Sequence, residues 1–163
     1  MIKQFIPQEV CLGCQGCCRF KEQDSVWSPC LLDEEIQAFL DKNIPPLCLS
    51  LDKKVMPIPN PQGEGYICSF FDIQDNKCKI YEFRPLECQL YPFLISLRNK
   101  KALLTVDLNC PYIKEKINSR EFKEYTDYLT NFLNSPKQSE LLKDNPHIIR
   151  AYEEVLDVIE LNI

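Results

Sequence analysis

The sequence contains little histidine, little glycine and no long apolar run. One histidine among 163 residues argues against catalytic or metal sites built mainly on imidazole. The four glycines form no glycine-rich loop for nucleotide phosphates. No apolar stretch is long enough to cross a bilayer, and the N-terminus carries no secretory signal. Acidic residues outnumber lysine and arginine, 24 against 19, which argues against a broad nucleic-acid surface.

These absences set the expected class and location of the protein. We predict a soluble, cytoplasmic protein with no nucleic-acid and no membrane partner, and leave an unknown protein partner open. The 45% apolar and 26% charged residues are typical of an ordinary folded domain. We expect a single domain over residues 1–163, with a metal-binding core over 8–112 and a helical extension packed on it over 113–163.

Cysteine is what the sequence has in excess. Ten of the 163 residues are cysteines, several times ordinary usage, and none follows residue 110. In a reducing cytosol such a pattern indicates metal binding or catalysis rather than disulfide bonds. The even number keeps a disulfide framework as an alternative.

The strongest motif is CxxCxxCC. It consists of four cysteines, Cys11, Cys14, Cys17 and Cys18. A CxxC step can fold so that both thiolates reach one metal while backbone N–H groups point at the sulfurs. Gly13 and Gly16 lie inside the motif and suit a turn whose backbone comes close to a ligand. Adjacent side chains point in different directions, so we expect one of Cys17 and Cys18 to bind a first site. The other would join a second site or pack.

A second group of cysteines comes from the middle of the chain: Cys68, Cys78, Cys88 and Cys110. Pro85 and Pro92 bracket a short helix that would hold Cys88 in its first turns, near free N–H groups that favour a thiolate. Cys30 and Cys48 are isolated in sequence, and we expect both to be small buried hydrophobes rather than ligands.

Together these motifs resemble the CxxCxxCC cysteine-cluster family (YkgJ-like), described as a zinc- or iron-chelating domain. The resemblance spans residues 8–112 and includes Cys78-Lys79-Ile80-Tyr81, Arg84-Pro85 and Tyr91-Pro92-Phe93. It implies metal chelation through eight cysteines, Cys11, Cys14, Cys17, Cys18, Cys68, Cys78, Cys88 and Cys110. Flagellin lysine N-methylases have a similar cysteine pattern and are associated with an iron–sulfur cluster. Gln89 departs from the family, which usually has arginine there, so a contact made by that arginine is in doubt here.

The thiolate ligands restrict the choice of metal. They exclude magnesium and calcium, which prefer oxygen, and leave Zn²⁺ or a 4Fe–4S cluster. Eight thiolates permit two four-ligand sites, or one cluster with spare ligands. Zinc commonly takes two separated CxxC pairs, whereas strict CxxCxxC succession is closer to the loop around a 4Fe–4S cluster, which we therefore favour. Arg19, Lys21 and Arg84 lie next to the motifs and could balance the charge of a buried anionic centre.

Three functions remain open from the sequence. We favour a metal-binding module that serves a redox step or a partner. A metal-dependent enzyme related to iron–sulfur protein-lysine methyl transfer is the second hypothesis, and a thiol-redox protein is the third. We assign no catalytic residue. Glu82 and Glu87 could act as acids or bases, but we expect them to be solvated or paired with Arg84.

The predicted fold class is α+β, with short strands and a hairpin followed by a helical last third. The hairpin spans 93–106, because apolar residues alternate on its two arms: Phe93, Ile95 and Leu97 on the first, Leu104 and Val106 on the second. It turns at Asn99-Lys100, because asparagine tolerates positive φ. Single strands are expected over 65–71 and 78–81. Helices are expected over 33–42 and 113–133, after Ser135-Pro136 and after Asn145-Pro146.

Overall fold

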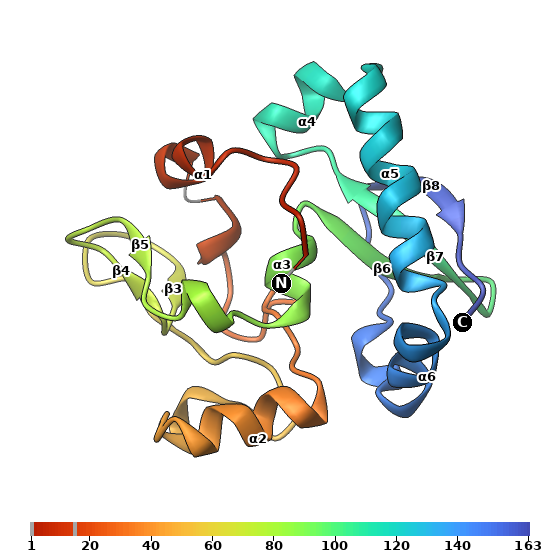
Figure 1. Ribbon diagram of the computed structural model, residues 1–163. Helices are drawn as coiled ribbons and strands as arrows, with labels where there is room; N and C mark the ends of the chain where they lie inside the picture. Colours follow the sequence, from red (N-terminus) through yellow and green to blue (C-terminus); the bar gives the residue numbers. More distant parts are fainter. Residues whose placement is uncertain (1, 15) are drawn as a thin grey trace. The chain divides into compact units, whose positions relative to one another are not determined.

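The computed structural model describes residues 2–14 and 16–163, and it has the predicted α+β class (Figure 1). The chain divides into two compact units. Unit 1 comprises Ile2 and Pro7–Gln89, and unit 2 comprises Lys3–Ile6 and Leu90–Ile163. The hairpin therefore belongs with the C-terminal helices, whereas the sequence grouped it with the cysteine motifs. That the whole chain is a single domain stays a prediction.

Unit 1 contains two small antiparallel sheets. The first has the order β1-β3-β2, with β1 at Arg19–Phe20, β3 at Tyr66–Cys68 and β2 at Pro57–Pro59. The second pairs β4, Phe71–Asp72, with β5, Lys77–Cys78. The single strand expected over 65–71 is thus split between the two sheets, and the strand expected over 78–81 ends at Cys78.

Short helices complete unit 1. They are α1 at Gln8–Cys14, α2 at Asp33–Asp41 and α3 at Leu86–Leu90, which reaches the boundary with unit 2, with 3₁₀ turns at Gly16–Cys18, Pro46–Cys48 and Tyr81–Phe83. Helix α2 forms where it was predicted. Its Phe39 is buried, whereas the neighbouring Leu40 is exposed.

The core of unit 1 is a cluster of five buried side chains, Leu31, Phe39, Val55, Phe70 and Ile80. Three cysteines pack against this cluster, Cys48, Cys68 and Cys78. The sulfur-bearing segments therefore rest directly on the apolar core.

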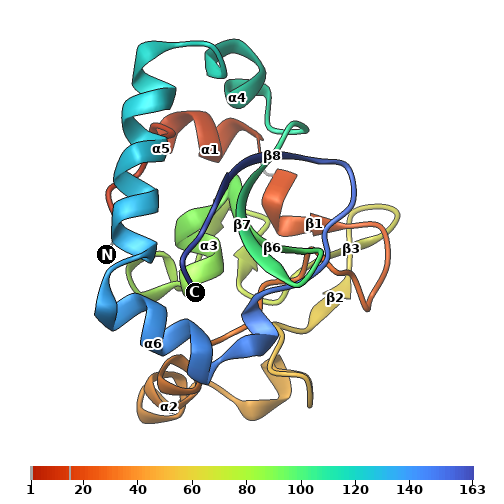
Figure 2. The ribbon, with the colours of Figure 1, turned by 90° about the vertical axis from the view of Figure 1, so that its right-hand side faces the viewer.

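Unit 2 is built on a three-stranded antiparallel sheet with the order β6-β7-β8 (Figure 2). Strands β6, Phe93–Arg98, and β7, Lys101–Asp107, form the predicted hairpin. Asn99 and Lys100 both have positive φ, 50° and 66°, as a tight two-residue turn requires. The register pairs Ile95 with Leu104, so the alternation seen in the sequence does mark one face of the sheet.

Helices α4, α5 and α6 follow the hairpin, at Pro111–Lys116, Arg120–Leu133 and Pro136–Asp144. The helix predicted over 113–133 is divided because the Ser119 hydroxyl accepts a hydrogen bond from the Phe122 N–H and starts a new helix. Helix α6 begins at Pro136, as the Ser-Pro signal predicted. No helix in the described residues combines the length and the apolar character needed to span a membrane.

The helix predicted after Asn145-Pro146 is wrong. The chain makes one 3₁₀ turn, Pro146–Ile148, and then extends into β8, Val155–Glu160, which pairs with β7. Glu154, with φ of 58°, precedes the strand. The edge of β7 offers backbone hydrogen bonds to the segment Val155–Glu160. The valine, leucine and isoleucine residues of this segment suit a strand as well as a helix. Tertiary pairing therefore decided its structure.

An aromatic cluster fills the space between the sheet and α5 in unit 2. Phe93 stacks on Phe122 at a centroid distance of 5.6 Å, and Phe5 stacks on Tyr125 at 5.0 Å. The Tyr125 hydroxyl also donates a hydrogen bond of 2.6 Å to the Lys3 carbonyl. The segment Lys3–Ile6 is thereby held in unit 2 rather than beside the next residues of the chain.

The hairpin turn yields a first prediction. Lys100 carries a side chain in the left-handed region, which costs an L-residue about 1–2 kcal/mol, so Lys100→Gly should raise the free energy of unfolding by about 0.5–1 kcal/mol. Urea unfolding followed by circular dichroism measures the change. Lys101→Gly, one residue later in β7, is the matched control and should lower stability. Equal or lower stability of Lys100→Gly would contradict this account of the turn.

Candidate metal centre

Cys17 and Cys18 lie in the 3₁₀ turn that links α1 to β1. Their sulfurs are 3.9 Å apart. The expectation that the two side chains diverge is therefore wrong. Side chains alternate along an extended strand but not along a helical turn, so adjacent residues here can turn to one side.

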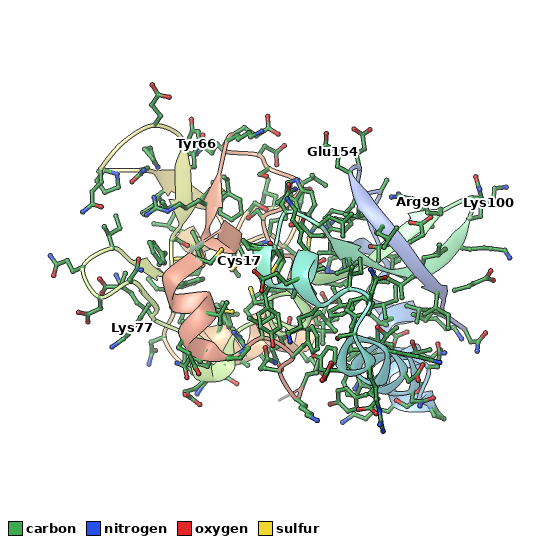
Figure 3. The ribbon with its side chains drawn as sticks, turned by 90° about the horizontal axis from the view of Figure 1, so that it is seen from above. Cys17, Tyr66, Lys77, Arg98, Lys100 and Glu154 are labelled. Carbon is green, nitrogen blue, oxygen red and sulfur yellow. The ribbon has the colours of Figure 1, made fainter. Side chains whose placement is uncertain are left out.

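Cys68 lies across from this turn. The antiparallel register pairs Arg19 with Ile67, so Cys18, one residue earlier, comes opposite Cys68 (Figure 3 labels Cys17 and Tyr66 on the two neighbouring segments). The Cys68 sulfur accepts a hydrogen bond from the Phe70 N–H. The sheet of unit 1 thus brings the end of the CxxCxxCC motif to the first cysteine of the second group.

Cys78 reaches the same region from the second sheet. It pairs with Phe71 on β4, three residues beyond Cys68. Its sulfur accepts a hydrogen bond from the Ile80 N–H. The sulfurs of Cys68 and Cys78 thus each accept a hydrogen bond from the N–H group two residues later in the chain. Such donors stabilise a negative charge on sulfur.

Cys88 is carried by α3, which starts directly after Pro85 as predicted. We expected the start of this helix to favour a thiolate. Burial instead raises the pKa of Cys88 well above its ordinary value, and the charges of Cys68, Cys17 and Cys78 raise it further. Desolvation and repulsion outweigh the helix end because they act directly on the buried sulfur.

The electrostatic interactions of these sulfurs converge on Cys17. Its charge acts on Cys18, Cys68, Cys78 and Cys88. Burial raises the pKa of Cys68 to about 12 and also raises that of Cys78. Hydrogen bonding to Cys17 is the main reason that the pKa of Cys18 is raised, whereas the same bond lowers that of Cys17. A negative charge on one of these five sulfurs, which lie on four elements of unit 1, therefore disfavours a charge on the others.

Arg84 is a cation that acts on this group. Its guanidinium lies 4.1 Å from the centroid of the Tyr81 ring, and its charge lowers the pKa values of Cys17 and Cys78. Arg19, also considered from the sequence, lies over the Phe71 ring at 5.5 Å. The positive charge expected beside the sulfurs is thus supplied by Arg84.

The remaining predicted ligands lie elsewhere. Cys11 and Cys14, three residues apart on α1, are exposed. Cys110 is buried at the N-terminus of α4, in unit 2. Their part in metal binding stays a prediction.

The structure changes or extends what the sequence indicated for three residues of unit 1. Cys48 is half-buried, and its charge acts on Cys68; only its isolated position in the sequence had set it aside. Glu87 is buried rather than solvated, and its carboxylate accepts a hydrogen bond of 2.6 Å from the N–H of Cys30, a cysteine that is buried as expected. Gln89 accepts a hydrogen bond from the Ile2 N–H and donates one to the Arg84 carbonyl. A neutral amide thus bridges these backbones.

The donor set fits a thiophilic metal. In the part of the chain that the structure describes, no three cysteine, histidine or acidic side chains already stand in the arrangement of a formed site. The five sulfurs nevertheless share one region, and most of them hold their protons because of burial and mutual repulsion. A bound cation would remove that repulsion and stabilise the deprotonated sulfurs. Zinc and iron both accept such ligands.

The fold and its sulfurs define a cysteine-rich α+β protein of a metal-binding kind. The family model described as "CxxCxxCC: Putative zinc- or iron-chelating domain" matches residues 10–155, so the chain belongs to this family. The match extends beyond residues 8–112, the span of the resemblance in the cysteine motifs. MJ0661 of Methanocaldococcus jannaschii, named as an uncharacterized protein, is 49% identical over 44 residues, which are 27% of this chain and 24% of that protein. The match thus covers less than a third of the relative. No solved structure matches.

Glu35 connects α2 to the helix that carries Cys88. Its two carboxylate oxygens accept hydrogen bonds from Leu32 N–H, at 2.9 Å, and Leu86 N–H, at 2.6 Å. Burial raises the pKa of Glu35 to about 7, above the ordinary 4.5. The folded state therefore binds the proton more tightly than the unfolded state does, and stability from this group is lost as the pH rises from about 4.5 through 7.

We therefore expect Glu35→Gln to remove part of the pH dependence of unfolding. The free energy of unfolding of the wild type minus that of the variant should decrease as the pH rises from 5.5 to 8. The reason is that Glu35 loses its proton over this range, whereas the glutamine amide does not titrate. Urea unfolding at both pH values measures this difference. Glu34→Gln, at the exposed neighbouring position, is the control for removing a charge near the same helix end. A difference that stays constant or rises with pH would contradict the assignment.

Gly65 controls the approach of β1 to β3. Its φ is 77°, and a Cβ built there would lie 2.7 Å from the Phe20 carbonyl oxygen. Gly65→Ala should lower the free energy of unfolding by about 1–2 kcal/mol and weaken metal binding, because β1 must shift. Gly63→Ala is the matched control, since its Cβ would meet only Asn60 Nδ2 at 3.5 Å. Unfolding and metal content are measured for both, and equal behaviour of the two variants would refute the role of Gly65.

Proposed function

We propose that this protein chelates zinc or iron in unit 1 through thiolates drawn from five cysteines, Cys17, Cys18, Cys68, Cys78 and Cys88. The observation that carries the proposal is that the Cys17 and Cys18 sulfurs lie 3.9 Å apart, with Cys68 opposite Cys18 in the sheet register, and that the charge of Cys17 acts on Cys18, Cys68, Cys78 and Cys88. Membership of the family described as zinc- or iron-chelating supports it.

Several features of the centre support a bound anionic metal complex. An ion with four thiolates carries net negative charge, and such a complex needs donors and cations around it. The Phe70 and Ile80 N–H groups supply donors, and Arg84 supplies a positive charge held against Tyr81. The apolar cluster of unit 1, against which Cys68 and Cys78 pack, partly shields these two cysteines from water.

The biological role that we propose depends on the metal. An iron–sulfur cluster, favoured by the CxxCxxC succession, would serve electron transfer, whereas zinc would stabilise a module that acts on a partner. Anaerobic purification followed by analysis of zinc, iron and acid-labile sulfide distinguishes these roles. Coloured protein with iron and sulfide supports the first, and colourless protein with zinc supports the second. Protein that takes up neither metal after anaerobic reconstitution would overturn the proposed function.

Replacing one of the proposed ligands tests the centre itself. Cys88→Ser should lower metal content and the free energy of unfolding together, because formation of a metal site is coupled to folding. Cys48→Ser is the control, since Cys48 is half-buried in the same unit but outside the family pattern. Metal analysis and urea unfolding are compared for the two variants. Wild-type metal content in Cys88→Ser would refute its role as a ligand.

A further inference from the structure

The distance between the adjacent sulfurs bears on how many metal ions they serve. Cys17 Sγ and Cys18 Sγ are 3.9 Å apart. A zinc–sulfur bond of about 2.3 Å places two sulfurs on one tetrahedral ion about 3.8 Å apart. In a 4Fe–4S cluster each cysteine binds a different iron at a corner of the cube and points outward, so ligand sulfurs lie farther apart. The observed separation fits two ligands of a single ion.

The rest of unit 1 indicates which sulfurs complete the set. Cys68 lies opposite Cys18 in the register of β1 and β3. The charges of Cys68 and Cys88 both act on Cys18, and that of Cys17 acts on both of them in turn. Cys68, through its place in the register, and Cys88, through its electrostatic interaction with Cys18, are therefore the candidates to complete the set.

Resting on the proposed metal binding, we propose that Cys17 and Cys18 bind the same ion, in a mononuclear centre that Cys68 and Cys88 complete. The inference differs from the sequence expectation in two ways. It uses both adjacent cysteines at one site, and it requires one zinc or iron ion in place of a 4Fe–4S cluster.

Cobalt substitution counts the thiolates on the ion. The full chain, stripped of metal and reloaded with Co²⁺ under anaerobic conditions, should show the absorption of tetrahedral Co²⁺ with four thiolates. Cys17→Ser and Cys18→Ser should each lower the sulfur-to-cobalt absorbance per bound ion by about a quarter, one ligand in four. Cys48→Ser, at a half-buried position in the same unit, is the matched control and should keep the wild-type spectrum. An unchanged spectrum in Cys18→Ser, or an equal loss in Cys48→Ser, would overturn the inference.

X-ray absorption of the wild-type protein with its own metal makes the test independent of how the variants fold. We expect a sulfur shell at a single distance and no metal–metal scattering. Metal–metal scattering, or several irons with sulfide for each chain, would overturn the mononuclear centre and leave metal chelation intact. Failure to bind zinc, iron or cobalt at all would overturn chelation as well, so the two proposals fail in different ways.

Discussion

Repulsion among closely placed, half-buried sulfurs is the constraint on which the cysteine-rich unit depends. Thiolates are poorly solvated where Cys68, Cys78 and Cys88 lie, and each negative charge there opposes the next. The thiols avoid this repulsion by keeping their protons, and under the proposed function they would also avoid it by sharing a cation. Loss of the protons and gain of a metal ion would then be a single event, and the affinity for metal would rise with pH.

The local structure of unit 1 lowers the cost of that event at particular sulfurs. Two backbone N–H groups point at Cys68 and Cys78, and Arg84 is held against the ring of Tyr81 near Cys17 and Cys78. The strands that provide these donors are only two or three residues long. Short strands of this kind gain little from pairing alone, so cross-linking by a metal would contribute a substantial share of the stability of this unit.

Unit 2 is stabilised by the burial of apolar side chains. Phe93, Leu104, Val106, Leu129 and Leu133 are all fully buried, and aromatic rings fill the space between sheet and helix. Burial of such side chains contributes about 1.5–3 kcal/mol each. The family match runs to residue 155, so most of this unit lies within the matched region.

The sequence alone determined the local features of this protein. Alternation and an asparagine at the turn predicted the hairpin, proline and serine predicted the start of α6, and cysteine spacing predicted the family. Only the tertiary structure decided that residues 155–160 pair with β7, because a free strand edge competes with helix formation. It also decided that Cys17 and Cys18 face one way and that Cys68 lies opposite Cys18. The spacing of cysteines along a chain indicates that a metal site is present. The directions of their side chains depend on turns and on strand register, which are set by pairing with distant segments.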